Sequence, residues 1–430
     1  MRRLADGSER ALAEVREAHS LAWSLDGAWI AYVSGNAIAF LPALFGNVAS
    51  SRILVVPASG GTPVLVTDDS HQNISPAWLP DGRLLFVSNR GGTNDVYLLA
   101  LRSDGVPAGK PLRLTTGLGA VSITASADGR TLAYSTLIRR QNVWSLAIPS
   151  SGIITLGGAR PITTGNQVIE GMAISPDGEW LAFDSDRAGN QDLYKVPLAG
   201  GDIVQLTHHP ADEFVNSWSA DRQWLAGHGF RRGNRDLFIV RSDGSDFQFV
   251  ALSSSHDRLP NWSPDGRRIA FLSERAGRSR NLFVTERNPD GEWSEPRQLT
   301  FNNAPWWPTG SPRWSPDGSW IAYVAPQSIR IVRGDGGDSR VIAQGPSPID
   351  PVGVAWSANG ESIIYIGHDS TGAFGFWTAP LSGGRPRLLV RFDSPDDQVR
   401  GGFIVHEDRL YFTRGQFDGD AWVLELRATR

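Results

Sequence analysis

Short apolar runs alternate with polar turns along the whole chain, and they recur in a fixed order. A strand that ends in Trp is followed by a polar turn and then by an apolar strand, as in Trp262–Gly266 followed by Ile269–Phe271. Pro restricts φ at the first central position of such a turn, and Gly accepts a conformation that a Cβ would oppose. The pattern therefore predicts a β-hairpin flanked by two strands.

This hairpin phrase occurs nine times, at intervals of 42 to 55 residues. Six copies keep Asp-Gly in the turn, and six carry Trp three residues before the turn acid. A recurring period of this length indicates a repeat architecture. The turn acids of the nine repeats are Asp26, Asp81, Asp128, Asp177, Asp221, Asp265, Asp317, Asn359 and Glu407.

Each repeat continues in the same way after its hairpin. A loop with Arg and Gly leads to a third strand such as Asp192–Val196, and a fourth strand often ends in Leu-Thr. Four antiparallel strands in about 45 residues make one propeller blade. The sequence thus predicts an all-β fold, a single closed β-propeller of nine four-stranded antiparallel blades. Eight blades are the alternative, because the first repeat carries an insertion over residues 36–51.

The two ends of the chain are expected to close the ring. The last repeat has strand patterns near Phe403–Val405, Leu410–Thr413 and Trp422–Leu424 but no fourth strand, and Ser8–Ala13 precedes the first repeat. We expect this N-terminal strand to complete the last blade, because an open ring would expose edge strands. One domain is predicted over residues 1–430, with a closing strand and linker over 1–18 and repeats over about 19–430.

Composition narrows the classes of partner. The net charge is −4, which predicts no nucleic-acid-binding face, and the absence of Cys excludes disulfides and thiolate sites. No apolar run is long enough to span a bilayer, and no secretory signal follows Met1. We expect a monomer without membrane insertion. Without a secretory signal, the protein is expected in the cytoplasm if the chain is complete. It is expected in the periplasm or otherwise outside the cytoplasm if the chain is an excised domain.

Motifs for catalysis are missing from the sequence. It contains no Gly-x-Ser-x-Gly motif, no P-loop and no His-Glu-x-x-His motif. It also lacks the Gly-rich loop, Lys and catalytic-loop motifs of protein kinases. We therefore predict no catalytic residues, metal site or cofactor. A pair of glycosidase carboxylates stays open, because such a pair forms in space rather than in sequence.

Residues that do not repeat are the better candidates for a site. They concentrate in the connections from the fourth strand of one blade to the first strand of the next, and loops carry function more often than scaffolds do. Trp and Arg are preferred at binding hot spots. Solvated surface is the alternative interpretation for each of them. The predicted partner-binding residues are His71, Asn73, Asn166, His209, Glu213, His256, Arg258, Asn303, Trp306 and Trp307.

One recurring charge pattern is interpreted as structural. An Arg in the loop after the second strand precedes the third-strand Asp by five residues, as in Arg90 and Asp95 or Arg187 and Asp192. Because the pair recurs from blade to blade, we expect the two side chains to form a structural ion pair.

The repeat wording resembles the bacterial TolB-like β-propeller. The resemblance rests on Ser175–Gly178, Trp262–Gly266, Trp314–Gly318 and the Asp-Leu-Tyr third strands, and it covers essentially the whole chain. It implies a propeller fold. Functions in the family differ: TolB binds a lipoprotein partner in the periplasm, and similar propellers accompany peptidase, regulator or kinase domains. Fold alone does not choose among them.

Two functions follow from these observations. The first is a non-catalytic binding scaffold that presents one loop face to a protein or peptide, as the sensor or interaction domain of a larger bacterial protein. The alternative is a carbohydrate-active or peptidase-associated propeller with a site at the mouth of the central channel. A purely structural role is disfavoured by the irregular spacing of the repeats.

Overall fold

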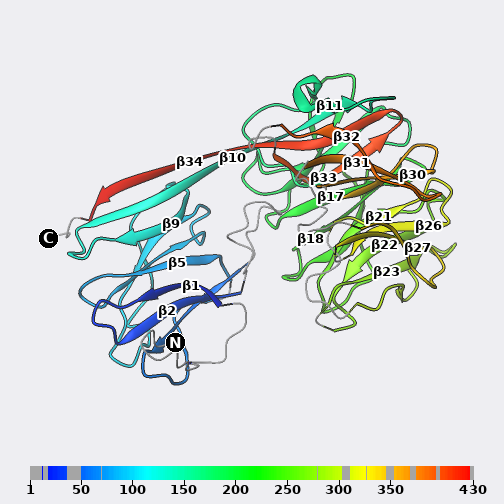
Figure 1. Ribbon diagram of the computed structural model, residues 1–430. Helices are drawn as coiled ribbons and strands as arrows, with labels where there is room; N and C mark the ends of the chain where they lie inside the picture. Colours follow the sequence, from blue (N-terminus) through cyan, green and yellow to red (C-terminus); the bar gives the residue numbers. More distant parts are fainter. Residues whose placement is uncertain are drawn as a thin grey trace. The chain divides into compact units, whose positions relative to one another are not determined.

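The structure is a computed structural model, and it is built almost entirely of β-strands (Figure 1). It describes residues 12, 18–35, 50–68, 70–277, 279–302, 310–325, 327–344, 353–368, 374–393 and 398–426. Their strands form eight sheets, and a 3₁₀ helix spans Leu156–Gly158. Within these ranges no helix has the length and apolar character needed to cross a membrane. The all-β prediction is confirmed.

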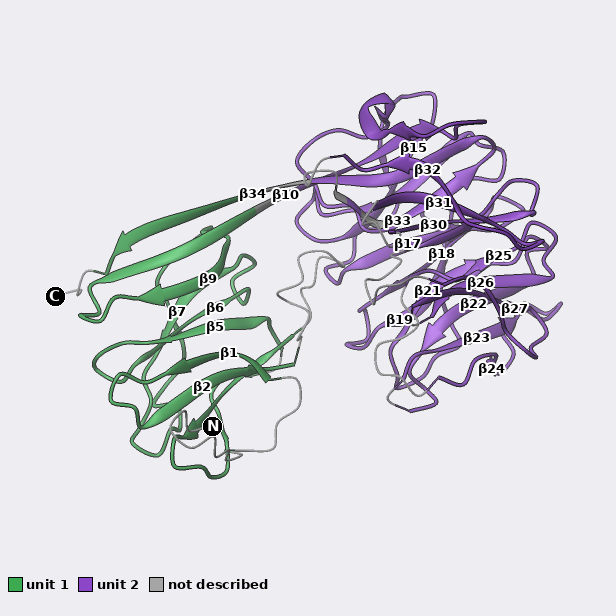
Figure 2. Ribbon diagram, viewed as in Figure 1, with its two compact units in different colours: residues 1–138, 417–430 green, residues 139–416 purple. Residues whose placement is uncertain are grey.

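Two compact units divide the chain (Figure 2). Unit 1 comprises residues 1–138 and 417–430. It holds two four-stranded sheets and the hairpin of β9 with the first half of β10, and β5 contacts both β1 and β9. Its strands are β1 (Ala18–Trp23), β2 (Trp29–Ser34), β3 (Arg52–Pro57), β4 (Val64–Leu65), β5 (Asn73–Trp78), β6 (Leu84–Ser88), β7 (Asp95–Leu99), β8 (Leu112–Arg113), β9 (Ala120–Ala125) and β10 (Thr131–Ala147).

Unit 2 comprises residues 139–416. The first three of its four-stranded sheets follow the repeats in order. They contain β13 (Met172–Ile174), β14 (Trp180–Ser185), β15 (Asp192–Pro197) and β16 (Val204–Gln205); β17 (Glu213–Trp218), β18 (Trp224–Gly229), β19 (Asp236–Arg241) and β20 (Phe247–Val250); and β21 (Asp257–Trp262), β22 (Arg268–Ser273), β23 (Asn281–Glu286) and β24 (Arg297–Gln298).

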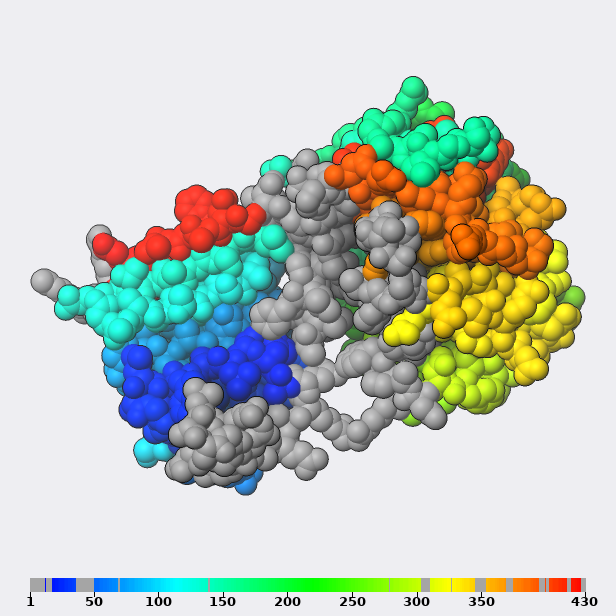
Figure 3. Space-filling model, viewed as in Figure 1, coloured from blue at the N-terminus to red at the C-terminus, as the bar shows by residue number. Residues whose placement is uncertain are grey.

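Three further sheets contribute strands to unit 2, and the last of them shares β10 and β34 with unit 1. Figure 3 shows the other two side by side in yellow and orange. Their strands are β25 (Arg313–Trp314), β26 (Trp320–Ala325), β27 (Ser328–Arg333) and β28 (Arg340–Gln344); β29 (Val354–Trp356), β30 (Ser362–His368), β31 (Phe374–Pro380) and β32 (Arg387–Arg391), joined in parallel by β11 (Ile154–Thr155); and β33 (Gln398–His406), β34 (Arg409–Glu425), β10 and β12 (Arg160–Pro161).

The first strands of the six sheets in unit 2 follow one another in a circle. β13 contacts β17, β17 contacts β21, and the contacts continue through β25 and β29 to β33, which contacts β13. Nine hairpins correspond to the nine turn acids, but their strands assemble into eight sheets in two units. A single closed ring of nine blades, or of eight, is therefore not confirmed, and one domain over residues 1–430 stays a prediction.

The end of the chain differs from its expected form. Trp422–Leu424 was predicted as a separate third strand, but it belongs to the 17-residue strand β34, which runs alongside β10 (Figure 1). β10 is also 17 residues long and lies next to β34 in the sheet, so its backbone can pair with β34 as far as Leu426, whose amide donates to the Arg130 carbonyl at 2.7 Å. The predicted closing strand lies outside the described residues except for Leu12, which packs against the first sheet beside Ile30.

The repeated turn acid caps its own hairpin, as predicted. In the seventh repeat, Asp317 Oδ1 accepts hydrogen bonds from the Ser319 amide at 3.0 Å and from the Ser315 hydroxyl at 2.5 Å. The Ser315 oxygen in turn accepts the Trp320 amide at 2.9 Å. The same arrangement recurs at Asp26, Asp128, Asp177, Asp221, Asp265 and Asn359.

The loop Arg has a structural partner, but not the one predicted. In the sixth repeat, Arg275 Nη2 donates to Asp257 Oδ2 at 2.8 Å, and the guanidinium lies over the stacked rings of Phe271 and Phe283. Asp257 is the first residue of the first strand, not of the third. The equivalent pairs in three other repeats are Arg90 with Asn73, Arg187 with Gln167 and Arg231 with Glu213.

Register explains this choice of partner. Asp257 pairs with Ser273, and Ser273 pairs with Asn281, so the ends of three strands lie in one row. Arg275 lies two residues after Ser273, the last residue of β22. Its side chain points back to the start of the first strand, β21. The third-strand residue is satisfied elsewhere, because Asn281 Oδ1 accepts from Thr300 Oγ1 at 3.2 Å, and Thr300 is the end of the recurrent Leu-Thr.

Candidate functional site

Two kinds of loop meet at one end of the sheets. They are the connections from the fourth strand of one repeat to the first strand of the next, and the Arg-containing loops between the second and third strands. β17 begins at Glu213, which pairs with Gly229 at the end of β18, and Gly229 pairs with Asp236 at the start of β19. The same row exists in the next sheet from Asp257 to Asn281. We call this the loop end of the sheets. The capped hairpin turns lie at the opposite end.

Two adjacent repeats break the repeat pattern at the loop end. The residue before the third strand is Asn94 or Gln191 in two repeats, but it is Arg235 and Arg280 in the fifth and sixth. Arg258 likewise occupies the second position of its strand, where Phe214 stands in the preceding repeat. The fold does not require these arginines, because other repeats form the same strands with different residues at these positions.

Arg258 and Arg280 share one carboxylate. Arg258 Nη2 donates to Glu274 Oε1 at 2.7 Å, and Arg280 Nε donates to the same oxygen at 3.2 Å. The side chains of Arg258 and Arg280 are 13% and 12% exposed, so both ions are largely removed from water. Arg258 Nε is buried without an acceptor among the described residues. These three residues and Arg235 form what we call the arginine cluster.

Arg235 belongs to this cluster through its charge. Its backbone amide donates to His256 Nδ1 at 3.2 Å, and its guanidinium lies 4.8 Å from the ring centre of Phe230 and 5.9 Å from that of Phe214. Over the described ranges this guanidinium has no hydrogen-bond acceptor. It is thus held by aromatic rings, with its donors still available.

Burial and mutual repulsion act on the cluster together. Desolvation lowers the pKa of Arg235 to about 10, and the nearby Arg280 acts in the same direction while Glu170 and Glu274 oppose it. The pKa of Arg258 is also lowered, first by desolvation and then by the charges of Arg235 and Arg280. The guanidiniums therefore destabilise one another, and a bound anion would relieve this repulsion.

Two imidazoles near the cluster are held neutral. His228 is buried, its Nδ1 lies 2.8 Å from Asn216 Oδ1, and desolvation followed by the charges of Arg235 and Arg258 lowers its pKa well below the ordinary value. The pKa of His256 is lowered by the same kinds of effect. Within the described part of the chain, no group of three or more His, Asp or Glu residues could hold a metal ion.

The structure brings some of the predicted residues together at the loop end of unit 2. Arg258 is in the arginine cluster, and His256 contacts its backbone. Glu213 is fully buried and bonded to Arg231, so it serves the strand-linking pair described above. His209 Nδ1 accepts the Ala211 amide at 3.0 Å within its own loop.

Other predicted residues lie elsewhere. Asn166 is exposed in unit 2. His71 and Asn73 belong to unit 1, where Asn73 is fully buried and its amide donates to the carbonyl oxygens of Ser51, Asp68 and His71. Three predicted residues lie outside the described residues, namely Asn303, Trp306 and Trp307.

Sequence reasoning missed Arg235, Glu274 and Arg280. Each lies in the loop between the second and third strands rather than in the connection between blades. The available signal was their departure from the repeat, which becomes visible only after the loops are aligned position by position. The same loops also contain the recurring Arg, and for this reason they were interpreted as structural.

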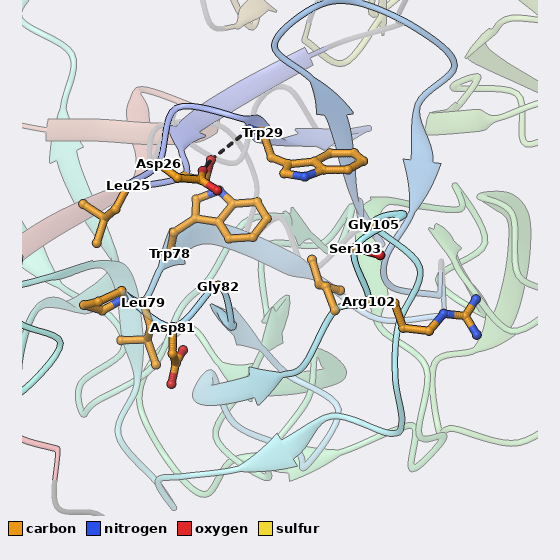
Figure 4. Close-up of a pocket in the computed structure, with 13 residues that line it drawn as sticks. Leu25, Asp26, Trp29, Trp78, Leu79, Asp81, Gly82, Arg102, Ser103 and Gly105 are labelled. Atoms are coloured by element: carbon orange, nitrogen blue, oxygen red, sulfur yellow. Dashed lines mark hydrogen bonds between the residues drawn. The ribbon is translucent and has the colours of Figure 1, made fainter.

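Unit 1 contains a separate cavity of about 220 Å³, in which the rings of Trp29 and Trp78 line the wall (Figure 4). Its other walls come from hairpin turns, and several of their polar groups are already used. Asp26 caps its own turn, and Trp78 Nε1 donates to the Ala22 carbonyl at 3.1 Å. None of the predicted site residues lines this cavity.

Comparisons with known proteins agree with the repeat. The family model described as the TolB beta propeller domain matches residues 210–383. Dipeptidyl-peptidase 5 of Porphyromonas endodontalis is 23% identical over 217 residues, which cover 39% of this chain and 31% of that protein. The Tol-Pal system protein TolB of Bordetella pertussis is 31% identical over 155 residues, covering 35% and 33% respectively.

A solved structure, TolB from Acinetobacter baumannii, aligns with 85% of this chain and 66% of its own at 15% identity and a TM-score of 0.27. The chain spans about a third of the length of the two curated relatives named above, Dipeptidyl-peptidase 5 and the Bordetella TolB protein.

Proposed function

We propose that this chain, a TolB-like β-propeller protein, is a non-catalytic binding module whose loop end in unit 2 recognises a protein or peptide. In this proposal the contacts are made by His256 and Arg258 from the sequence-predicted set, and by Arg235, Glu274 and Arg280. The module would serve as an interaction or sensor domain.

A single observation carries this proposal. Two adjacent repeats replace ordinary repeat residues by charged ones at the same end of their sheets, and the Arg235 guanidinium and Arg258 Nε have no acceptor among the described residues. Arg is one of the residue types enriched at binding hot spots. The relative named for the Tol-Pal system supports a role within an assembly of proteins.

Peptide selection on the purified chain tests this function. Peptides would be selected from a random library on the wild-type protein, and their affinities would then be measured by calorimetry against Arg258→Gln. The matched control is Arg267→Gln, which removes the same charge from an exposed turn at the opposite end of the same sheet. We expect at least a tenfold loss for Arg258→Gln and none for the control. Equal affinities for both variants would exclude this face.

The match to a dipeptidyl-peptidase favours one alternative, a propeller that accompanies a peptidase domain. The proposal would then concern substrate guidance rather than partner recognition. Calorimetry with a panel of dipeptide amide substrates tests whether the chain binds them. Binding that is lost in Arg258→Gln but kept in Arg267→Gln would favour substrate guidance over recognition of a larger partner.

A further inference from the structure

We infer that the cavity in unit 1 is a binding site for an organic cation, an alkylammonium or guanidinium group that lies against the rings of Trp29 and Trp78 and pairs with the Asp26 carboxylate. The inference goes beyond the function proposed above, because it concerns other residues in the other unit. The cavity volume of about 220 Å³ is below the roughly 300 to 1,000 Å³ of pockets for drug-sized ligands, so it suits a ligand the size of one side chain.

Trp29 differs from its counterparts in other repeats because no cation covers its ring. Three other repeats also begin their second strand with Trp, and in each of them a cation of the same repeat lies over the indole. The pairs are Trp180 with Lys195 at 4.8 Å, Trp224 with Arg241 at 4.5 Å and Trp320 with Arg333 at 5.4 Å, measured to the ring centre. Among the described residues, no cation lies over Trp29 in this way.

Strand register shows why the first repeat lacks this cation. In two of the three other repeats the cation stands directly opposite Trp, and the residue opposite Trp29 is Pro57. Lys195 stands two residues earlier on its strand, where the first repeat has Val55. An apolar residue therefore occupies each position from which another repeat supplies its cation, and the Trp29 ring borders the cavity instead (Figure 4).

The Asp26 carboxylate also lacks the cation that the equivalent acid of the fourth repeat has. Its Oδ1 caps the hairpin turn, and its Oδ2 has no partner among the described residues. In the fourth repeat, Asp177 Oδ2 accepts Arg222 Nη1 from the next repeat at 2.6 Å. Gly82 stands at the position of Arg222 and lines the cavity. The hydrogen bond from the Ser24 hydroxyl holds the pKa of Asp26 below its ordinary value, so this carboxylate is charged at neutral pH.

The other charged groups that line the cavity are already paired. Asp81 Oδ2 accepts Arg83 Nε at 2.8 Å. Arg102 Nε lies 3.4 Å from Asp104 Oδ1. The lining thus presents one uncompensated negative charge, that of Asp26, next to two indole rings. One cation balances this charge.

A cation accounts for the cavity better than a neutral sugar does. Both kinds of ligand pack against aromatic rings, but a cation is also attracted electrostatically to the face of an indole, which is the strongest of the aromatic side chains in this respect. The nearby carboxylate adds to that attraction, whereas a neutral hydroxyl gains only a hydrogen bond. The chain itself places ammonium or guanidinium groups on the equivalent ring in three other repeats.

Titrations followed by NMR of the indole N–H groups test the inference. The probes are the N-acetyl methylamides of lysine and arginine, and that of norleucine is the neutral match for lysine. The n-butylammonium ion and methyl glucoside are titrated separately. The signal of Trp29 is assigned by its loss in Trp29→Phe.

The variants are Asp26→Asn, Gly82→Arg and the control Asp128→Asn, each checked for its fold by circular dichroism. Asn359 caps the equivalent turn in the eighth repeat, so Asp26→Asn should keep its turn. Gly82→Arg copies Arg222, which has a φ of +64° where Gly82 has +81°. Asp128 caps a turn of unit 1 in the same way but does not line the cavity.

We expect saturable binding of the lysine and arginine derivatives to the wild type and to the control. The norleucine derivative should bind at least about tenfold more weakly, and Asp26→Asn should lose about fivefold or more in affinity for the cations. Gly82→Arg should abolish binding, because its own guanidinium would reach Asp26 as Arg222 reaches Asp177. Added salt should weaken binding. Tighter binding of the capped amino acids than of n-butylammonium would identify a side chain of a partner as the source of the cation, and the reverse order would identify a free amine.

The inference would be overturned by the absence of binding of any cation, by equal binding of the lysine and norleucine derivatives, or by binding of methyl glucoside alone. Unchanged affinity in Asp26→Asn would overturn it as well, and this variant decides the matter by itself should Gly82→Arg fail to fold. Peptide selection against Arg258→Gln tests a different unit, so either result can fail without the other.

Discussion

Replacing Arg275 by Met should destabilise the sheet β21–β24 because it leaves a buried carboxylate without its cation. Asp257 is 1% exposed and Arg275 is 18% exposed. After the change, Asp257 Oδ2 would keep only the Ser253 hydroxyl at 3.0 Å, and the Ala251 carbonyl and Ser273 hydroxyl would each lose a donor. Met preserves much of the apolar stem, so the loss is mainly electrostatic.

The magnitude follows from the burial of the pair. Removing one partner of a buried ion pair costs about 3 to 5 kcal/mol. Because Arg275 retains some contact with water, we expect the lower end, about 3 kcal/mol, or roughly a hundredfold more frequent opening of the sheet. The guanidinium also lies over Phe271 and Phe283 at 5.3 and 5.5 Å, which adds a smaller loss.

Hydrogen exchange measured by mass spectrometry is the suitable assay, since it reports the opening of residues 257–286 separately from the rest of the chain. Arg187→Met is the matched control, because its partner Gln167 is neutral and the cost should be only about 1 to 2 kcal/mol. In a double-mutant cycle, Asp257→Asn should reduce the cost of Arg275→Met. Equal costs at Arg275 and Arg187, or strictly additive changes in the cycle, would refute this reasoning.

Three further predictions concern the packing and titration of unit 2. Gly171→Ala should cost more than about 3 kcal/mol in urea denaturation, since its Cβ would lie 2.0 Å from the Val215 carbonyl oxygen; wild-type stability would contradict this. Burial raises the pKa of Asp184 to about 8, above roughly 3.9 in an unfolded chain, so the stability from this group is complete below about pH 4 and declines up to about pH 8. Denaturation from pH 4 to 9 should show a flatter profile for Asp184→Asn, and identical profiles would argue against a protonated Asp184. Ser315→Ala should cost about 1 kcal/mol in thermal or urea unfolding by removing two turn hydrogen bonds, and no loss would mean that Asp317 caps the turn alone.

Local features could be predicted from the sequence because they depend on residues close together in the chain. The capped turn at Asp317 needs only Ser315, Ser319 and Trp320, all within five residues. Strand order within each repeat is similarly local, since short turns join successive strands. The candidate site was predicted in part: Arg258 was named, whereas Arg235 was not.

Partners distant in sequence were decided by the tertiary structure. The pairing of Arg275 with Asp257 instead of a third-strand residue depends on the register of three strands, and a spacing of five residues cannot express that register. The long pairing of β34 with β10 joins segments more than 260 residues apart. The phrase that recurs along the chain therefore determined the hairpins and the fold class. Only the packing of repeats decided how the strands are shared between sheets and which arginines come together, because these outcomes depend on contacts between repeats rather than within them.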